Sequence, residues 1–475
     1  MADEPLESFD VVTVGGGPGA TPGALILAEH GLRVAVVERG EGLGGTCLFE
    51  GCIPSKIFLE SAHRLEDIRQ RDEFALMGPA EVRLDLSRLQ ARKQAILRVR
   101  VEGARQRAEH AGLNIVRGHG QLLDPHTIEV ITSGEERRRL QGRYLLLAPG
   151  SETSRPPIPG VEAPGLWTSE DALASEELPD SLVIVGGGYI GCELAAFFAA
   201  VGTRVTMVEM LPRLLETEDP LAAAAVQSSL VRRGVAVHTG SRVERISRNG
   251  AGWKIRFTGA DGGPGSAAAA RVLLAVGRRP RTAELAWDRA GLSLGRRGEV
   301  PVNRFYQTSV PHIYVTGDAN GQVMLAHAAT RQSEIAAWHM LGTERQVDPL
   351  VIPHVIFTEP EVASVGLDSR ACADDRALAA FRYPYAADAR ARIVGDAAGF
   401  VQLVWKPETH ELRGVQVVGT GAGELLAEAT NVLRRGGLVD ELTETVHSHP
   451  TLGEVVAEAA AAALAGQGPR ADEAP

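Results

Sequence analysis

Two cysteines that lie close together are the first residues in this sequence that could do chemistry. Cys47 and Cys52 occur in the run GGTCLFEGCIPSK, and Pro54 follows as a residue typical of a first helical turn. Two thiols at this spacing can form a redox-active disulfide, and a helix start together with Lys56 would stabilise a thiolate at Cys52. Two buried thiols or half of a zinc site are alternatives, but zinc would need two more ligands and the other cysteines are distant in sequence.

A histidine-rich segment near the C-terminal end is the second candidate. Residues 447–454 read HSHPTLGE, in which Glu454 follows two histidines. An imidazole can take a proton from a thiol near neutral pH, and a carboxylate can hold the ring in one tautomer. A lone histidine is more often a surface or core residue, but the His–Pro–Thr context and Glu454 favour acid–base chemistry here.

Two glycine-rich turns repeat one pattern of three small residues and an acid. The first copy consists of Gly15, Gly17, Ala20 and Glu38, and the second of Gly186, Gly188, Gly191 and Glu209. Glycines permit a tight turn and let backbone N–H groups approach a pyrophosphate, while the acid can accept hydrogen bonds from a ribose. Glycine-rich turns also close many ordinary loops. Two copies with matching acids favour two bound dinucleotides and electron transfer between them.

The elements that must position these residues are two β-α-β units. Residues 11–38 and 182–209 each read as an apolar run, a glycine turn, a helical stretch and a second apolar run. Apolar runs of this kind are typical of parallel strands buried on both faces. We therefore predict an α/β fold with two doubly wound dinucleotide-binding domains. After about Pro349, strand-like runs such as 400–405 and 412–418 predict a C-terminal α+β interface domain.

The composition is that of a globular protein with an excess of acid. Lys and Arg number 49 against 60 Asp and Glu, so the net charge of −11 argues against nucleic acid as a partner. Four cysteines in 475 residues exclude a disulfide-stapled secreted scaffold. The N-terminal residues lack a signal-peptide pattern, and no run reaches the roughly 18 apolar residues of a membrane span. We expect a cytoplasmic protein with no membrane partner.

Taken together, these motifs resemble the pyridine nucleotide–disulfide oxidoreductase family, most closely its dihydrolipoamide dehydrogenases, over nearly the whole chain. GGTCLFEGCIPSK is similar to the family's redox motif. Four further runs are similar to the second flavin motif, the exit from the NAD domain, the third flavin motif and the start of the interface domain: LLLAPGS (145–151), LAVGRRP (274–280), HIYVTGDA (312–319) and FTEPEVASVGL (357–367). Pro149 replaces the usual Thr, and Phe49-Glu50 replaces Asn followed by an apolar or basic residue.

The resemblance also implies a role for each candidate residue. A dihydrolipoyl thiolate would attack Cys47, and the released Cys52 thiolate would lie against the flavin. His449 would act as acid–base at the disulfide of the other subunit, oriented by Glu454, with His447 as a bystander.

Lys56 and Glu193 are placed similarly to a family ion pair beside the flavin, although two separate surface charges are an alternative. The implied cofactor-binding residues are Gly15, Gly17, Ala20, Glu38, Gly45, Thr46, Lys56, Gly150, Gly186, Gly188, Gly191, Glu209, Gly277, Asp318 and Ala326.

The resemblance implies four segments and one function. Residues 1–150 would form the first part of an FAD-binding domain, 151–280 an NAD-binding domain, 281–349 a segment completing the FAD domain, and 350–475 a dimerisation domain. The implied enzyme is a homodimer with FAD and NAD that oxidises protein-bound dihydrolipoyl groups, on a lipoyl-carrier protein or in a 2-oxoacid dehydrogenase complex.

Three alternatives are a glutathione reductase-like enzyme, a mercuric reductase-like enzyme and a catalytically quiet, NAD-responsive flavoprotein. Glu209 and HPTLGE disfavour the first, because an NADP enzyme usually carries arginine near the 2′-phosphate. The second is disfavoured because the tail has no cysteine pair. The intact Cys47–Cys52 and His449–Glu454 pairs argue against the third.

Overall fold

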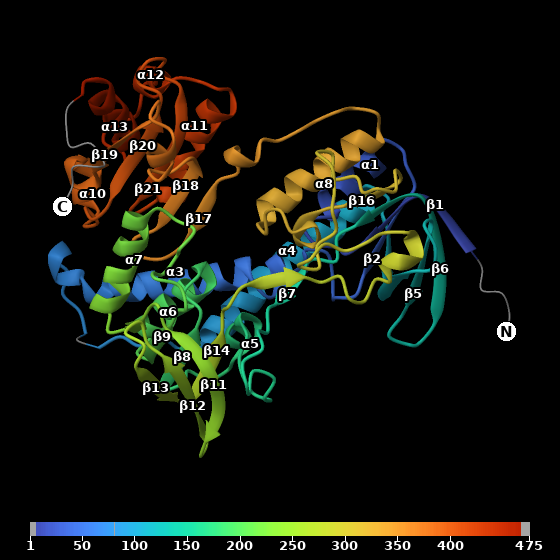
Figure 1. The fold of residues 1–475 in the computed structure, drawn as a ribbon, viewed down its shortest axis with the longest axis horizontal. Helices are drawn as coiled ribbons and strands as arrows, with labels where there is room; N and C mark the ends of the chain where they lie inside the picture. Colours follow the sequence, from blue (N-terminus) through green and yellow to red (C-terminus); the bar gives the residue numbers. More distant parts are fainter. Residues whose placement is uncertain (1–5, 80, 467–475) are drawn as a thin grey trace.

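The computed structural model describes residues 6–79 and 81–466. Figure 1 shows a first β-sheet at the right, a second region of sheets below the centre, and a C-terminal region at the upper left. Helix α3 (Cys52–Arg69) lies between these regions. No helix among the described residues is long and apolar enough to cross a membrane.

The first sheet is built around the first glycine turn. Its strands follow the order β3-β2-β1-β6-β5-β4, with β16 beside β6. They are β1 (Leu6–Val14), β2 (Val34–Glu38), β3 (Asn114–Arg117), β4 (His119–Leu122), β5 (Thr127–Ile131), β6 (Arg137–Leu147) and β16 (Ile313–Val315). Strand β1 pairs in parallel with β2 and β6, and Val11 and Val12 within it are fully buried. Although β16 is distant in sequence, it completes this sheet by pairing in parallel with β6.

Several helices and short 3₁₀ turns belong to the same region as this sheet. They are α1 (Thr21–Glu29), α2 (Gly45–Phe49), α4 (Leu86–His110) and α8 (Ala326–Met340), with the 3₁₀ turns η1 (Arg71–Phe74), η2 (Trp287–Ala290) and η3 (Gly317–Asn320). Helices α1 and α8 approach closely at Gly23, whose N–H donates to Ser333 Oγ at 2.8 Å. A Cβ at Gly23 would lie 2.6 Å from the Ser333 carbonyl oxygen, so glycine is what allows this approach.

The second glycine turn belongs to a parallel sheet ordered β10-β9-β8-β14. This sheet and its helices comprise β8 (Ser181–Val185), β9 (Arg204–Val208), β10 (Ala236–His238), β14 (Arg271–Leu274), α5 (Ser169–Ala174), α6 (Tyr189–Ala200) and α7 (Pro220–Arg232). An antiparallel sheet of β11 (Arg242–Asn249), β12 (Gly252–Thr258) and β13 (Pro264–Ala269) lies beside it, and β7 (Ser151–Thr153) pairs with β15 (Arg278–Pro280). Helix α6 is almost wholly buried because its sequence is apolar on nearly every face.

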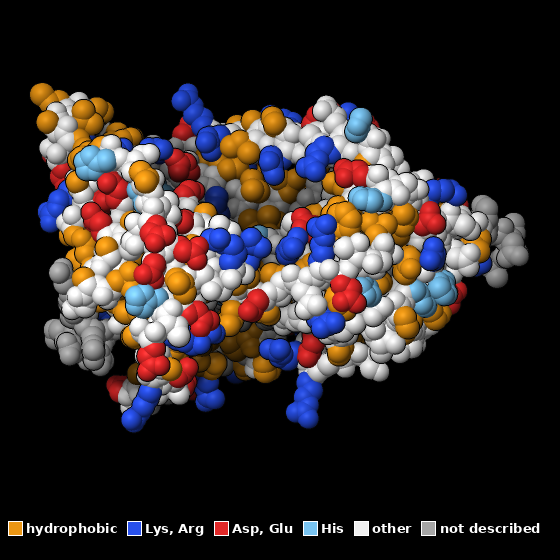
Figure 2. Space-filling view, turned by 90° about the horizontal axis from the view of Figure 1, so that it is seen from above, with side chains coloured by type: hydrophobic (Ala, Val, Ile, Leu, Met, Phe, Trp, Pro, Cys, Tyr) orange, Lys and Arg blue, Asp and Glu red, His pale blue; other side chains and the backbone are white. Residues whose placement is uncertain are grey.

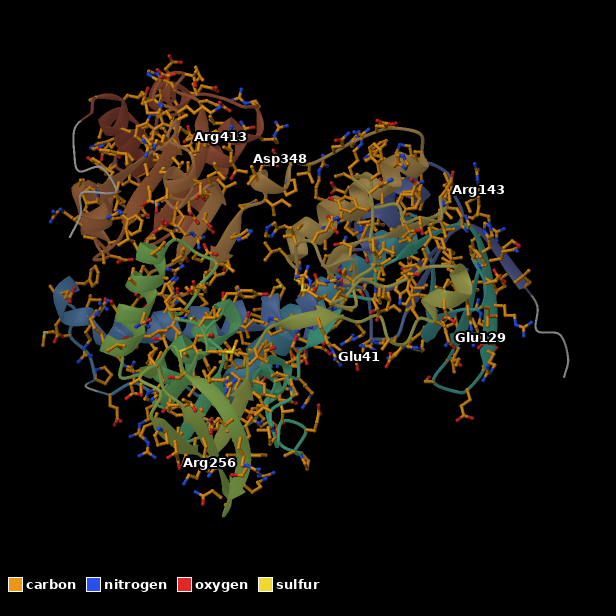
Figure 3. All side chains as sticks on the ribbon, in the orientation of Figure 1. Glu41, Glu129, Arg143, Arg256, Asp348 and Arg413 are labelled. Carbon is orange, nitrogen blue, oxygen red and sulfur yellow. The ribbon has the colours of Figure 1, made fainter. Side chains whose placement is uncertain are left out.

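The C-terminal region is a five-stranded antiparallel sheet, ordered β17-β18-β21-β20-β19, packed against helices. Its elements are β17 (His354–Ile356), β18 (Val362–Gly366), β19 (Ala379–Pro384), β20 (Phe400–Trp405), β21 (Leu412–Val418), α9 (Ala371–Asp374), α10 (Ala389–Ile393), α11 (Ala422–Arg434), α12 (Val439–Glu444) and α13 (Glu454–Leu464), with η4 (Pro349–Val351) and η5 (Tyr385–Ala387). Asp348, labelled in Figure 3, marks the connection from α8 to this sheet. Seen from above, the molecule is hollowed between its left and right parts, with hydrophobic side chains in the hollow (Figure 2).

The predicted fold class is confirmed. Both predicted β-α-β units are present, as β1-α1-β2 and β8-α6-β9, and each uses parallel strands. The predicted strands at 400–405 and 412–418 are β20 and β21. The predicted segment boundaries stay a prediction.

Candidate active site

A cleft of about 580 Å³ brings together residues from both β-α-β units and from α3. Twelve of the predicted site residues line it: Gly15, Gly17, Glu38, Gly45, Thr46, Cys47, Cys52, Lys56, Gly150, Glu193, Asp318 and Ala326. Phe49 and Glu50, the pair that departs from the family motif, also line the cleft, as does Glu41, which is labelled in Figure 3. The redox candidates and the first glycine turn therefore share one cavity.

The first glycine turn is shaped by backbone contacts that no side chain could replace. Gly15 has a φ of 99°, and a Cβ there would lie 2.3 Å from the Ala148 carbonyl oxygen. Gly45 has a φ of 56°, and a Cβ there would lie 2.8 Å from the Gly17 Cα. Because both positions favour glycine, the cleft keeps a floor of backbone rather than side chains, which suits a bound pyrophosphate.

The acids at the ends of β2 and just after β9 are held in the same way. Glu38 accepts the N–H of Gly16 through Oε2 at 2.5 Å and that of Gly40 through Oε1 at 2.6 Å. Glu209 accepts the N–H of Gly187 through Oε2 at 2.5 Å, and its Oε1 accepts from Leu211 at 2.6 Å. Each carboxylate oxygen keeps a further lone pair, so both acids can still accept a ribose hydroxyl.

The residues of the second glycine turn do not line this cleft. Ala20 of the first turn is buried, and the other predicted residues outside the lining are Gly186, Gly188, Gly191, Glu209, Gly277, His449 and Glu454. A Cβ at Gly191 would lie 2.2 Å from the Gly186 carbonyl oxygen, whereas one at Gly188 would meet nothing within 4 Å. The turn is therefore tight on its inner side and open at Gly188. Helix α6 leads from this turn to the cleft, which it lines through Tyr189, Ile190, Glu193 and Leu194.

The two redox cysteines come from adjacent helices and are free thiols in contact with each other. Cys47 lies within α2, and Cys52 is the first residue of α3. The hydrogen bond with Cys47 and the charge of Lys56, opposed by burial, together lower the pKa of Cys52 to about 7. The same hydrogen bond, together with burial, raises the pKa of Cys47. Cys52 therefore holds the negative charge and Cys47 the proton, as expected for a thiolate at a helix N-terminus.

The charge beside the thiols belongs to a half-buried ion pair. Lys56 Nζ lies 2.9 Å from Glu193 Oε1 and 2.8 Å from Oε2, and the Glu193 side chain is only 5% exposed. The alternative of two separate surface charges is therefore wrong. Glu193 Oε1 also accepts the N–H of Phe357 at 3.0 Å, which ties this pair to the start of the C-terminal sheet.

The predicted histidine–glutamate pair forms, but it lies outside the cleft that holds the two cysteines. His449 Nδ1 lies 2.9 Å from Glu454 Oε1, and Oε2 accepts the N–H of Thr451 at 2.8 Å. These two contacts, the backbone one first, lower the pKa of Glu454. The His449 side chain is 76% exposed and does not line the cleft, so a single chain does not bring it to Cys47. His447 has a carboxylate partner of its own, because its Nε2 lies 2.8 Å from Glu428 Oε2.

Sequence reasoning gave no role to three residues that the structure places in the cleft. Ser151 Oγ donates to Asp318 Oδ2 at 2.5 Å, and Arg278 Nε donates to Ser151 Oγ at 2.8 Å, so this chain of contacts fixes the Asp318 carboxylate. Tyr189 lines the cleft beside Glu193. Ser151 and Arg278 lie in motifs quoted above, but only their contacts reveal what they do. Among the described residues, no cluster of three or more His, Cys, Asp or Glu could hold a metal ion.

Comparison with known proteins agrees with this geometry. Residues 9–333 match the family described as pyridine nucleotide-disulphide oxidoreductase, and residues 352–460 match its dimerisation domain. A dihydrolipoyl dehydrogenase from Bacillus subtilis is 36% identical over 94% of this chain and 96% of its own length. One from Thermus scotoductus is 34% identical over 96% of this chain and 98% of its own length.

Two solved structures share the fold. LpdA from Mycobacterium tuberculosis superposes with a TM-score of 0.88 at 26% identity, covering 96% of this chain and 99% of its own. A Cu(II) complex of the HOCl-induced flavoprotein disulfide reductase RclA from Escherichia coli superposes with a TM-score of 0.86 at 26% identity, covering 96% of this chain and 99% of its own.

Proposed function

Because this chain belongs to the pyridine nucleotide-disulphide oxidoreductase family, we propose that it oxidises dihydrolipoyl groups and reduces NAD+ through the Cys47–Cys52 pair. The observation that carries this proposal is the pair of contacting thiols in the cleft of the first glycine turn, with the lower pKa at Cys52. Relatives named dihydrolipoyl dehydrogenase match nearly the whole chain and support the choice of substrate.

FAD and NAD(H) are the cofactors of this family, and the residues present fit both. The backbone floor at Gly15 and Gly17, with Glu38 and Asp318, would hold FAD in the cleft. The open turn at Gly188, with Glu209, would hold NAD. When bound, these cofactors supply hydride transfer, which no amino-acid side chain provides.

The side chains of the cleft account for the exchange between thiols and disulfide. In the oxidised enzyme, in which Cys47 and Cys52 are joined by a disulfide, a substrate thiolate attacks Cys47, the Cys47–Cys52 bond breaks, and Cys52 leaves as a thiolate carrying the bonding electron pair. The second substrate sulfur then attacks the mixed disulfide, forming the lipoyl disulfide and releasing Cys47. The substrate loses two electrons and two protons, the cysteine pair gains the two electrons, and the protons end on Cys47 and on His449.

His449 can take part only if it comes from a second copy of the chain. Its ring is exposed and outside the cleft, while Glu454 and Thr451 hold the pair in one orientation. The match of residues 352–460 to a dimerisation domain supports a homodimer. In that dimer, His449 of one subunit would serve Cys47 of the other, with Glu454 fixing the ring tautomer.

The physiological substrate would be a dihydrolipoyl group on a lipoyl-carrier protein or in a 2-oxoacid dehydrogenase complex. The test is a turnover assay with NAD+ and three thiol substrates: a reduced lipoyl protein, free dihydrolipoamide and glutathione. We expect turnover of both lipoyl substrates, its loss in Cys47→Ser, and normal rates in the control Cys372→Ser. Turnover of glutathione alone, or of none of the three, would contradict the proposal.

A further inference from the structure

We propose that Phe357 is a positioning residue for the redox centre: its ring holds the Lys56 ammonium where that charge stabilises the Cys52 thiolate. Phe357 lies just after β17, far in sequence from both redox helices. The inference rests on the proposed function, because it assigns the residue a part in tuning the same cysteine pair.

Phe357 contacts both members of the ion pair beside the thiols. The Lys56 Nζ lies 4.6 Å from the centroid of the Phe357 ring, which is within the range of a cation–π interaction. The Phe357 backbone N–H donates to Glu193 Oε1 at 3.0 Å. The ammonium therefore has the Glu193 carboxylate as one partner and the ring face as the other.

The chain that follows Phe357 is anchored, which restrains the position of the ring. Thr358 is buried, and its Oγ1 donates to the Pro360 carbonyl oxygen at 2.8 Å. Glu359 pairs with Arg233 at the end of α7 and lies 3.6 Å from His63 Nε2 on α3. The segment therefore lies against α3, which is also the helix of Cys52 and Lys56.

The position of the ammonium matters because opposite charges act on Cys52 together. Lys56 lowers the pKa of Cys52 and Glu193 raises it, while the contacting Cys47 supplies the largest lowering effect. The charge of Cys52 contributes to a raised pKa of Tyr189 in α6. The charge of Arg100 in α4 acts to lower the pKa of Cys47. The electrostatic effect on the thiolate is therefore the difference between the attraction of Lys56 and the repulsion of Glu193, and this difference changes when the Lys56 ammonium moves.

The Phe357 ring favours the attraction of Lys56 for the thiolate and therefore a lower pKa of Cys52. Its face attracts the Lys56 ammonium and holds it near the thiolate, although the Lys56 side chain is partly exposed to water. A leucine in its place would leave the backbone contact to Glu193 intact but remove the ring face. The ammonium would then be less restrained and could move away from Cys52, which would weaken its attraction for the thiolate and raise the pKa of Cys52.

The test measures the Cys52 thiol alone, in the reduced holoenzyme of a Cys47→Ser background. The rate of Cys52 alkylation by iodoacetamide, followed by mass spectrometry, is measured against pH for Phe357, Phe357→Leu and Phe357→Tyr. A second series places fluorinated phenylalanines at 357, because each fluorine weakens the negative face while the ring keeps nearly the same shape. Thermal unfolding of each variant is recorded beside the titration.

We expect Phe357→Leu to raise the alkylation midpoint by about half a pH unit, Phe357→Tyr to leave it unchanged, and fluorination to raise it stepwise. An unchanged midpoint in the leucine and fluorinated proteins would overturn the proposal. Equal shifts for leucine and tyrosine would also overturn it, since they would report altered packing. Failure of the proposed function shows separately, as absent dihydrolipoamide turnover in the unmodified protein.

Discussion

At the scale of single residues, the structure shows that the two contacting cysteines lie in different helices and differ in pKa. Cys52 begins α3 and has Lys56 one turn further along the same helix, whereas Cys47 lies within the short helix α2. The hydrogen bond between them lowers the pKa of one thiol and raises that of the other. The two thiols therefore differ in charge, because Cys52 carries the negative charge while Cys47 keeps its proton.

The difference in pKa predicts how the Cys52 thiolate titrates in the two-electron-reduced holoenzyme and in the two single-cysteine variants with oxidised FAD. The pKa of Cys52 is lowered to about 7, so its thiolate, and the long-wavelength charge-transfer absorbance it gives, should be present above that pH and fade as the pH falls through it. Cys52→Ser should abolish the band, whereas Cys47→Ser should keep it. Spectrophotometric pH titration checks both variants, and identical behaviour of the two would show that the assignment is wrong.

A second prediction at this scale concerns coenzyme choice. Because Gly187 and Leu211 both donate to Glu209, the carboxylate cannot swing away from an incoming 2′-phosphate. Two unit charges about 4 Å apart repel by roughly 4 kcal/mol at an effective dielectric of 20, so even a screened fraction gives a tenfold preference for NAD+. We expect kcat/KM for NAD+ to exceed that for NADP+ at least tenfold, and Glu209→Gln to narrow the gap. Equal values in the unmodified protein would contradict this.

At the scale of elements, the cleft depends on how closely helices and strands approach one another. Helix α1 meets α8 at Gly23, and α8 carries Ala326 and Ala329 into the cleft lining. Helix α6 joins the second glycine turn to the same cleft. A change in either packing contact would therefore move the walls of the cofactor site.

Gly23 offers a direct test of this packing. A Cβ there would lie 2.6 Å from the Ser333 carbonyl oxygen, so Gly23→Ala should push α1 from α8 and cost about 1–3 kcal/mol of unfolding free energy. It should also increase the loss of FAD on dilution. The matched control is Gly103→Ala in α4, where a Cβ meets nothing within 4 Å and the substitution should be neutral or stabilising. Denaturant unfolding and flavin fluorescence measure both effects, and equal behaviour of the two variants would exclude the packing argument.

At the scale of the whole molecule, the proposed function means that one chain would hold two incomplete halves of a site. The cysteine pair lies in the cleft, whereas His449 and Glu454 lie on the C-terminal region. The region matched to a dimerisation domain carries the second half. Two identical chains can complete two sites if each supplies its histidine to the other.

This arrangement predicts complementation between inactive variants. Cys47→Ser and His449→Gln homodimers should each have little activity, but mixing and refolding them should restore partial activity, because a heterodimer contains one intact pair of half-sites. Dihydrolipoamide turnover of the mixture, against each variant refolded alone, is the measurement. A fully active monomer in sedimentation analysis would contradict the prediction.

The features that could be predicted from the sequence alone are those set by residues close together along the chain. The glycine turns, the acids that follow them and the Cys47–Cys52 spacing are set by residues that are neighbours along the chain, and the backbone geometry of a turn or a helix start places them together. The continuous apolar runs likewise predicted both β-α-β units, and the strand-like runs at 400–405 and 412–418 predicted the C-terminal α+β domain. Resemblance to a family added the expected roles of His449 and Glu454.

Other contacts, between residues that are far apart in the sequence, became visible only in the folded chain. The contacts of Lys56 with Phe357 and of Asp318 with Ser151 join segments that are far apart in sequence and have no shared periodicity. Their pairing depends on how sheets and helices pack, which is set by the burial of the whole apolar surface rather than by any local pattern. For the same reason, the sequence located His449 near the C-terminal end, but its exposure outside the cleft became visible only in the folded chain.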